Sequence, residues 1–304
     1  MTIIELVGLR FDGYGRPGNQ TAAAGALRRE GIARPSSGKM DDAGDIAPPE
    51  QSAERGPNGL INEYALLHVK QELSRRVESS ISRGRFPLVV GGDCSALLGS
   101  LTGARDALGD CGLLHIDGHE DTTPIDASED GEAANSEIGM LLGMVGRGIT
   151  GDIGEGLPAL ERGALALLGQ RDDQWRRDLN LGSLETLGVW KRGWEAIAAD
   201  AAGAARAAVA HVRHSVGEWW LHIDVDVMDP IEFPAQGLPD FPDEPGGLTR
   251  AQLADLVSAA AAEAGCVGAS IAIYDPNQDP EGSGAKYVVK LAHQIVQAVN
   301  GGRR

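Results

Sequence analysis

The sequence has little cysteine, few aromatic residues, no long apolar run and no concentration of basic residues. Its three cysteines, Cys94, Cys111 and Cys266, are odd in number and form no CxxC pair, which argues against a disulfide scaffold and favours a reducing cytoplasm. No apolar run reaches the roughly 18–20 residues that span a bilayer, and the first residues lack the basic region and long apolar core of a signal peptide. With a formal net charge of −17 and no Lys/Arg cluster, neither nucleic acid nor a membrane is an expected partner.

Glycine is plentiful instead, with 42 residues in a chain of 304, and hydrophobic residues make up 42%. This composition fits an α/β enzyme with a sizeable core and many tight turns. The apolar patterns predict strands at residues 2–9, 86–90, 112–117, 163–168, 218–225 and 267–273. They predict helices at 21–30, 60–83, 95–107, 137–145, 193–213, 249–264 and 283–299, and a long connection at 33–59. Because strands and helices alternate, we expect a mostly parallel sheet covered on both faces.

Two acidic motifs carry most of the functional signal. The first reads LLHIDGHED at residues 113–121, and the second reads LHIDVDVMDP at residues 221–230. Because side chains alternate along a strand, we expect the polar residues of each motif to share one face. Five ligand-type residues then converge at the ends of two strands: Asp117, His119, Asp121, Asp224 and Asp226. A lone Asp or His at a strand end usually caps a turn or faces solvent. Unpaired carboxylates this close repel each other, so the two runs together predict a site for two metal ions.

A third motif, GGDCS at residues 91–95, follows the strand predicted at 86–90 and begins a helix. Its glycines allow a sharp turn and a close approach of the backbone to a ligand. Alone, this junction is weak evidence, because phosphate binding or ordinary turn chemistry also explains it. It gains meaning because it precedes the first acidic motif by one strand–helix unit.

Together these motifs resemble those of the ureohydrolase (arginase, agmatinase and formiminoglutamase) superfamily. In that family GGDHS, DAHxD and SxDxDxxDP segments hold two manganese ions. The resemblance extends to the helix around Arg28, to Gly44-Asp45 and to the GGLT segment at 246–249. It implies a single arginase-like metallohydrolase domain over residues 1–304. The implied fold is a three-layer α/β/α sandwich with a mostly parallel sheet of about eight strands, and the implied assembly is a homotrimer or homohexamer.

Carried over by position, the resemblance implies that Asp117 and Asp224 bridge the two ions. Asp121 then completes one ion's shell, and His119 and Asp226 complete the other. Oxygen and imidazole donors suit Mn²⁺, and a hydroxide held between the metals is the implied nucleophile. The implied reaction is hydrolysis of a C–N bond in a small guanidino, amidino or ureido compound.

Cys94 is the first departure from the family's pattern, because it stands where the family has a metal-binding His. One interpretation is that its thiolate is a ligand and shifts the preference toward Zn²⁺ or Fe²⁺. The other is a small buried cysteine beside a site with one ligand fewer.

The second departure lies at Ile273 and Asp275. The family's pattern there is E-x-x-P-x-x-D, and its Glu binds the substrate's guanidinium; here Ile273 takes that position. A buried guanidinium facing Ile loses a charge-assisted partner, on the order of a few kcal/mol. The substrate is then expected to be a modified guanidine such as N-hydroxyarginine, or a neutral amide on the same scaffold, unless Asp275 or Asp279 compensates. A non-catalytic binding or assembly protein with this fold is a third hypothesis.

The third departure is Glu137, which falls at or next to the family's proton-shuttling His in an N-x-H-G stretch. A Glu with a raised pKa can do the same acid–base work, whereas a Glu at a helix N-terminus is also favoured by the helix dipole alone. Glu137 and Asp121 are therefore the candidate catalytic residues. His115 and His222 lie two residues before Asp117 and Asp224, and either orient these carboxylates or are ordinary strand residues.

Overall fold

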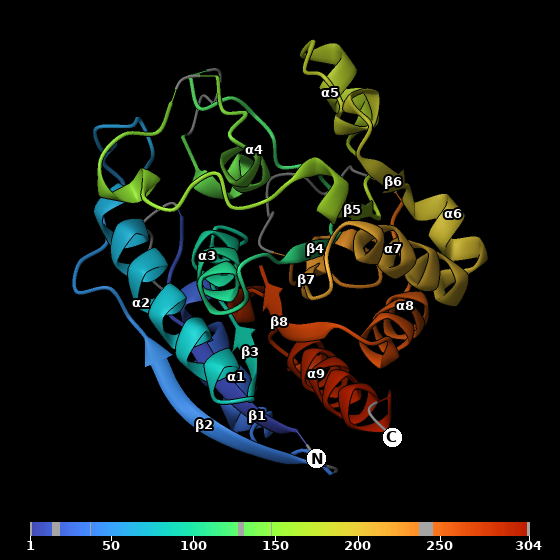
Figure 1. Cartoon of the computed structure of the whole chain (residues 1–304). Helices are drawn as coiled ribbons and strands as arrows, with labels where there is room; N and C mark the ends of the chain where they lie inside the picture. Colours follow the sequence, from blue (N-terminus) through green and yellow to red (C-terminus); the bar gives the residue numbers. More distant parts are fainter. Residues whose placement is uncertain are drawn as a thin grey trace.

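The computed structural model describes residues 2–13, 19–36, 38–126, 131–146, 148–236 and 246–302. Its centre is one eight-stranded sheet, in which every pair of neighbouring strands is parallel, in the order β2-β1-β3-β8-β7-β4-β5-β6 (Figure 1). The strands are β1 (Ile3–Leu9), β2 (Lys39–Ile46), β3 (Phe86–Val90), β4 (Gly112–Ile116), β5 (Leu165–Leu168), β6 (Trp190–Arg192), β7 (Trp219–Asp224) and β8 (Cys266–Ala272). The predicted fold class is confirmed.

Helices cover both faces of this sheet. They are α1 (Ala23–Glu30), α2 (Glu63–Ser82), α3 (Ala96–Leu108), α4 (Glu137–Leu142), α5 (Asp173–Asp178), α6 (Trp194–Ala199), α7 (Ala201–Ser215), α8 (Arg250–Ala262) and α9 (Ser283–Gly302). In Figure 1, α2 and α3 lie on one side of the sheet and α7, α8 and α9 on the other. None of the helices in the described ranges is long and apolar enough to cross a membrane.

Two apolar cores fill the spaces between the three layers. Alternate strand residues enter opposite cores, as expected from the two-residue period of a strand. Trp219 packs with α7, α8 and α9, whereas Trp220 packs with α2 and α3, and both are fully buried. The tryptophans at 219 and 220 are thus core residues, one for each layer.

The sequence patterns missed both edge strands and one helix break. The connection expected at 33–59 contains β2, whose polar residues are half-exposed because it pairs only with β1. The opposite edge, β6, is three residues long and too short to show a pattern. The single helix expected at 193–213 is divided at Asp200, whose side chain accepts a hydrogen bond from the amide of Gly203 at 2.8 Å and begins α7.

The sequence motifs follow the carboxyl ends of the four central strands and therefore lie together at that end of the sheet. GGDCS follows β3, Ile273 follows β8, the second acidic motif follows β7 and the first follows β4. After β3 the backbone turns at Gly91 with φ 86°, where a Cβ atom would lie 2.9 Å from the carbonyl oxygen of Leu9. Only glycine fits there, and the turn carries the next residues over the strand ends.

Candidate metal centre

The first acidic motif forms a turn beyond its strand. β4 ends at Ile116, and Asp121 has a left-handed backbone with φ 46°. The amide of His119 donates a hydrogen bond to Oδ1 of Asp117 at 2.7 Å. The expectation of a shared strand face at residues 117–121 is therefore wrong, because a turn brings these side chains together.

The second acidic motif also ends in a turn. β7 runs to Asp224, and Val225–Val227 form one 3₁₀ turn in which the amide of Asp226 donates to Oδ1 of Asp224 at 2.7 Å. The amide of Gly118 donates to Oδ1 of Asp226 at 3.0 Å. This bond ties the two motifs together across 108 residues of sequence.

The structure brings Asp117, His119 and Asp226 into one group. Nδ1 of His119 lies 3.0 Å from Oδ2 of Asp226 and 3.6 Å from Oδ1 of Asp117. One ligand atom from each residue lies within 4.8 Å of the others, a spacing that one cation can satisfy.

A second group surrounds Cys94. Its Sγ atom lies 2.7 Å from Oδ2 of Asp224 and 3.9 Å from Oδ2 of Asp117. Ligand atoms of Cys94, Asp121 and Glu137 also lie within 4.8 Å of one another. Cys94 is thus inside the cluster and next to both aspartates that the sequence pairs as bridging ligands.

Glu137 is the first residue of α4 and is fully buried. Neither of its carboxylate oxygens has a hydrogen-bond partner among the residues that the structure describes. The amide of Gly139 donates to the carbonyl of Asp121 at 3.1 Å, and the amide of Thr123 donates to the carbonyl of Asn135 at 2.9 Å. These two bonds fold the start of α4 back over the first acidic motif, so Glu137 points into the cluster instead of into solvent.

Burial and like charge act together on these carboxyl groups. Burial, followed by the charges of Asp121 and Asp226, raises the pKa of Asp117 well above its ordinary value. Burial and the charges of Asp226 and Asp117 do the same to the pKa of Asp224, and burial with Asp121 and Asp117 raises the pKa of Glu137. Without added positive charge, the cluster therefore favours protonated carboxyls.

Asp226 and Cys94 differ in what surrounds them. Although burial opposes it, the pKa of Asp226 is lowered because His119 and Arg171 place positive charge beside it. Burial and the carboxylates of Asp224 and Asp117 raise the pKa of the Cys94 thiol. A thiolate at this position therefore needs a cation nearby.

Two buried histidines also reach the cluster. His115 and His222 are register partners on β4 and β7, and both are 0% exposed. Nε2 of His115 lies 3.3 Å from Oδ2 of Asp117 and 3.5 Å from Oδ2 of Asp121. Nε2 of His222 lies 3.2 Å from Sγ of Cys94. Both histidines contact predicted metal ligands directly. They are therefore part of the cluster's surroundings and do more than fill positions in a strand.

Ile273 forms an apolar wall of the same region. It packs with Cys94, Ala134 and Ala272, and its amide donates to the carbonyl of Gly92 at 2.9 Å. Its φ of 71° is left-handed, a conformation that costs a β-branched residue about 1–3 kcal/mol. Ile273 therefore places an apolar side chain, on a left-handed backbone, beside Cys94.

Asp275, which the sequence suggested as a substitute partner for the substrate's guanidinium, caps a turn. Its Oδ1 atom accepts a hydrogen bond from the amide of Asn277 at 2.8 Å and caps the 3₁₀ turn Pro276–Gln278. Burial raises the pKa of this carboxyl. It is absent from the ligand-type groups found within the described ranges, so its side chain serves the turn.

Sequence reasoning missed a buried ionic network that holds the first acidic motif in place. Glu120 is fully buried, and its carboxylate accepts hydrogen bonds from Lys191 Nζ at 2.9 Å, from Ser183 Oγ at 2.6 Å and from the amide of Leu184 at 2.8 Å. Its own amide donates to Asp172 at 3.1 Å. Because Lys191 lies on the short edge strand β6, only detection of that strand would have suggested its role.

Comparison with known proteins identifies the family. The family model described as "Arginase family" matches residues 3–297. The chain belongs to the arginase family. It is 27% identical to an arginase of Bacillus caldovelox over 69% of each chain, and 29% identical to an arginase of Brevibacillus brevis over 66% of each. The native structure of the Bacillus caldovelox arginase superposes with a TM-score of 0.83, covering 97% of this chain and 98% of that one at 24% identity. Family membership makes the chain a hydrolase of non-peptide C–N bonds.

The residues of this arginase-family centre fit divalent cations. Glu137 keeps two buried oxygens without hydrogen-bond partners, and His115 keeps two such nitrogens, within the part of the chain that is described. Buried polar atoms of this kind are costly unless something binds them. The donor set of carboxylate oxygens, imidazole nitrogens and one sulfur suits Mn²⁺, Fe²⁺ or Zn²⁺.

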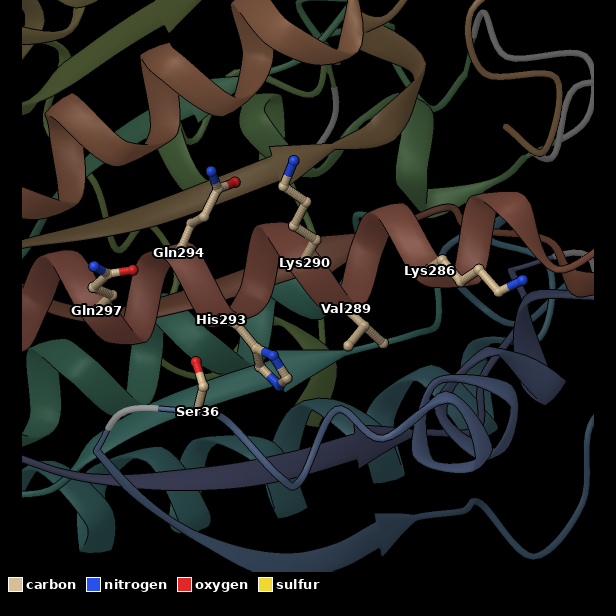
Figure 2. A pocket seen from close by; sticks show the side chains of 7 residues that line it. All are labelled: Ser36, Lys286, Val289, Lys290, His293, Gln294 and Gln297. Atoms are coloured by element: carbon tan, nitrogen blue, oxygen red, sulfur yellow. The ribbon is translucent and has the colours of Figure 1, made fainter.

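A separate groove lies on the outer side of α9. Figure 2 shows its lining, which consists of Ser36, Lys286, Val289, Lys290, His293, Gln294 and Gln297, and its volume is about 420 Å³. No residue of this lining belongs to the carboxylate cluster, so the groove and the metal centre are distinct features.

Proposed function

We propose that this chain is a binuclear-metal hydrolase that cleaves a C–N bond of a small guanidino, amidino or ureido compound. The observation that carries the proposal is the convergence of Asp117, His119, Asp121, Asp224 and Asp226 from β4 and β7 at one edge of the sheet. Asp117, His119 and Asp226 would hold one cation. Asp117, Asp121 and Cys94 would hold the other, with Asp224 between them.

Two divalent cations, with Mn²⁺ favoured and Zn²⁺ or Fe²⁺ as candidates because of Cys94, would supply Lewis acidity that lowers the pKa of water and polarises the electrophilic carbon. Hydrolysis adds a hydroxyl group to that carbon and a proton to the departing nitrogen. We assign the proton to Glu137, because its carboxyl lies in the cluster beside Asp121 and because burial and that neighbouring charge raise its pKa. Asp121 acts with it as a ligand and as the charge that contributes most to this rise in pKa after burial.

The substrate is proposed to be a modified guanidine, such as an N-hydroxylated arginine. Ile273, Cys94 and Ala134 form an apolar surface where a guanidinium-binding carboxylate is expected, and Asp275 is occupied by a turn. A less basic hydroxyguanidine loses less free energy without a charged partner than a guanidinium does. The same apolar surface favours the second candidate, hydrolysis of a neutral amide.

Turnover assays on metal-loaded protein test this assignment. Urea and ammonia release is measured with guanidino, hydroxyguanidino, formimino and amide compounds after addition of Mn²⁺, and separately of Zn²⁺. We expect release of urea or a substituted urea from a hydroxyguanidine at a higher kcat/KM than from arginine. Exclusive turnover of amides supports the second candidate. Full metal occupancy without any turnover would contradict both and support a binding or assembly protein.

Further proposals concern the setting of the protein. Its three buried cysteines form no disulfide, which favours a reducing cytoplasm. We propose that residues 1–304 act as one metallohydrolase domain and assemble into a homotrimer or homohexamer. Analytical ultracentrifugation distinguishes these assemblies from a monomer.

A further inference from the structure

His115 and His222 form a stacked pair beneath the carboxylate cluster. Their ring centroids are 5.4 Å apart and their planes differ by 6°. Both rings are completely buried. The two histidines nevertheless have very different hydrogen-bond partners, and this difference separates their roles.

His222 has both ring nitrogens engaged by protein groups. Trp220 Nε1 can only donate, and it donates to Ser270 Oγ at 2.9 Å. The Ser270 hydroxyl hydrogen is then free to point at Nδ1 of His222, 2.7 Å away. In a neutral imidazole this leaves the proton on Nε2, which lies 3.2 Å from Sγ of Cys94 and donates to it. A nitrogen that carries this proton has no lone pair for a metal.

His115 has neither ring nitrogen in a hydrogen bond within the described part of the chain. Its Nε2 atom faces two carboxylates, Oδ2 of Asp117 at 3.3 Å and Oδ2 of Asp121 at 3.5 Å. One ligand atom from each of these three residues lies within 4.8 Å of the other two. A buried nitrogen aimed between two acidic groups has the surroundings of a ligand, and stacking on His222 fixes the plane of its ring.

We propose that Nε2 of His115 is a direct ligand of the cation held by Asp117 and Asp121. This inference rests on the proposed function. It adds an imidazole ligand from β4, whereas the turn at residues 91–95 supplies Cys94 and no histidine. Each ion then keeps one imidazole, from His119 for one and from His115 for the other. The sulfur of Cys94 adds to that shell and is itself oriented by His222.

Nuclear magnetic resonance of protein with ¹⁵N-labelled histidine tests the ligand directly. The chain has seven histidines, so their side-chain ¹H–¹⁵N correlations are few enough to assign with single variants. The probe is Zn²⁺ alone, because it is diamagnetic, and bound metal is counted in parallel by mass spectrometry of the elements. On Zn²⁺ addition we expect two ring nitrogens, Nδ1 of His119 and Nε2 of His115, to move to shifts typical of metal-bound imidazole. Both His222 nitrogens keep shifts typical of hydrogen-bonded imidazole.

Three variants complete the test. His115→Phe keeps a flat ring stacked on His222 but removes both nitrogens. Loss of an outer hydrogen-bond partner weakens metal binding by roughly 10- to 100-fold. We expect His115→Phe to weaken the binding of one ion by more than that. The matched control, His222→Phe, should weaken the same ion by no more than that range, and the His115 shift should persist. His115→Gln repeats the measurement if the Phe variant does not fold.

The outcomes separate this inference from the function on which it rests. Binding of two Zn²⁺ ions with the His115 resonances unmoved, or with His222 showing the metal-bound shift in its place, overturns the His115 ligand and leaves the binuclear hydrolase intact. Failure of the wild-type protein to bind any Zn²⁺ or Mn²⁺ counts against the binuclear hydrolase itself.

Discussion

Sγ of Cys94 lies 2.7 Å from Oδ2 of Asp224, although the two residues are 130 positions apart in the sequence. This contact places a sulfur beside a carboxylate that the motif pattern pairs with two metal ions. His222, on β7, contacts the same sulfur at 3.2 Å. Position 94, which follows the glycine turn, is therefore part of the metal centre.

Cys94→Ala tests whether the sulfur binds metal. We expect one of two ions to be lost or bound at least roughly tenfold more weakly, while the ion held by Asp117, His119 and Asp226 remains. The measurement is metal content after dialysis against a graded chelator. Cys94→Ser, which has nearly the same size and a harder donor atom, should retain Mn²⁺ better than Zn²⁺. Unchanged occupancy of both sites in Cys94→Ala would show that Cys94 is only a packing residue.

Ile273→Glu is expected to shift specificity toward an unsubstituted guanidine. A carboxylate at this position restores a charge-assisted hydrogen bond of about 1.5–3 kcal/mol, which corresponds to roughly 10- to 100-fold in relative kcat/KM. The measurement is the ratio of kcat/KM for arginine to that for N-hydroxyarginine. Ile273→Val keeps the apolar wall and serves as the control. An unchanged ratio in the Glu variant would remove Ile273 from the specificity argument.

The contribution of the buried carboxyl groups to the stability of the metal-free protein should fall as pH rises, whereas the buried His222, whose pKa is lowered, contributes in the opposite sense. Folding raises the pKa of Glu137 above its ordinary value of 4.5, and the pKa of Asp117 and Asp224 above 3.8. The folded state then binds more protons than the unfolded state, so this stabilisation is complete below those ordinary values and is lost as pH rises through the raised ones. Thermal melting in chelator between about pH 4 and pH 8 should show the decline, and added Mn²⁺ should oppose it at the upper end.

Glu137→Gln should flatten part of that decline, because an amide cannot titrate. It should also abolish proton delivery, lowering kcat by about 10²- to 10⁴-fold while two ions still bind. Glu161→Gln, at an exposed position, is the control for both measurements. A Glu137→Gln enzyme with wild-type kcat would exclude the proton-donor role, and a loss of one ion would reassign Glu137 as a ligand.

Lys191→Met tests the ionic network under the first acidic motif. This variant removes the nearer of the two cations beside the buried Glu120 and leaves Arg176 Nη2 at 3.7 Å from Oε2. We therefore expect a loss at the lower end of the range of about 3–5 kcal/mol in the free energy of unfolding. Urea denaturation of the metal-free protein measures it. The control is Lys39→Met, because Lys39 pairs with Asp41 at the surface and such pairs contribute about 0–1 kcal/mol. Equal effects in the two variants would contradict a specific role for Lys191.

The reaction class and most of the sheet can be predicted from the amino-acid sequence alone. Its central strands are continuous apolar runs, since both faces are covered, and such runs are readable without a structure. The edge strands β2 and β6 escaped because polar or very short strands at an edge carry no clear period. The metal centre could also be predicted from the acidic motifs, because several carboxylates at neighbouring strand ends repel one another unless they bind cations.

How these residues come into contact depends on the tertiary structure. Turns at residues 117–121 and 225–227, not strand faces, bring the acidic groups together. The side-by-side order of β3, β8, β7 and β4 sets His222 against Cys94 and His115 against His222, and a fold-back of the chain buries Glu137 among them. Such contacts join residues far apart in the chain, and their distances depend on strand order and register, which local patterns do not encode.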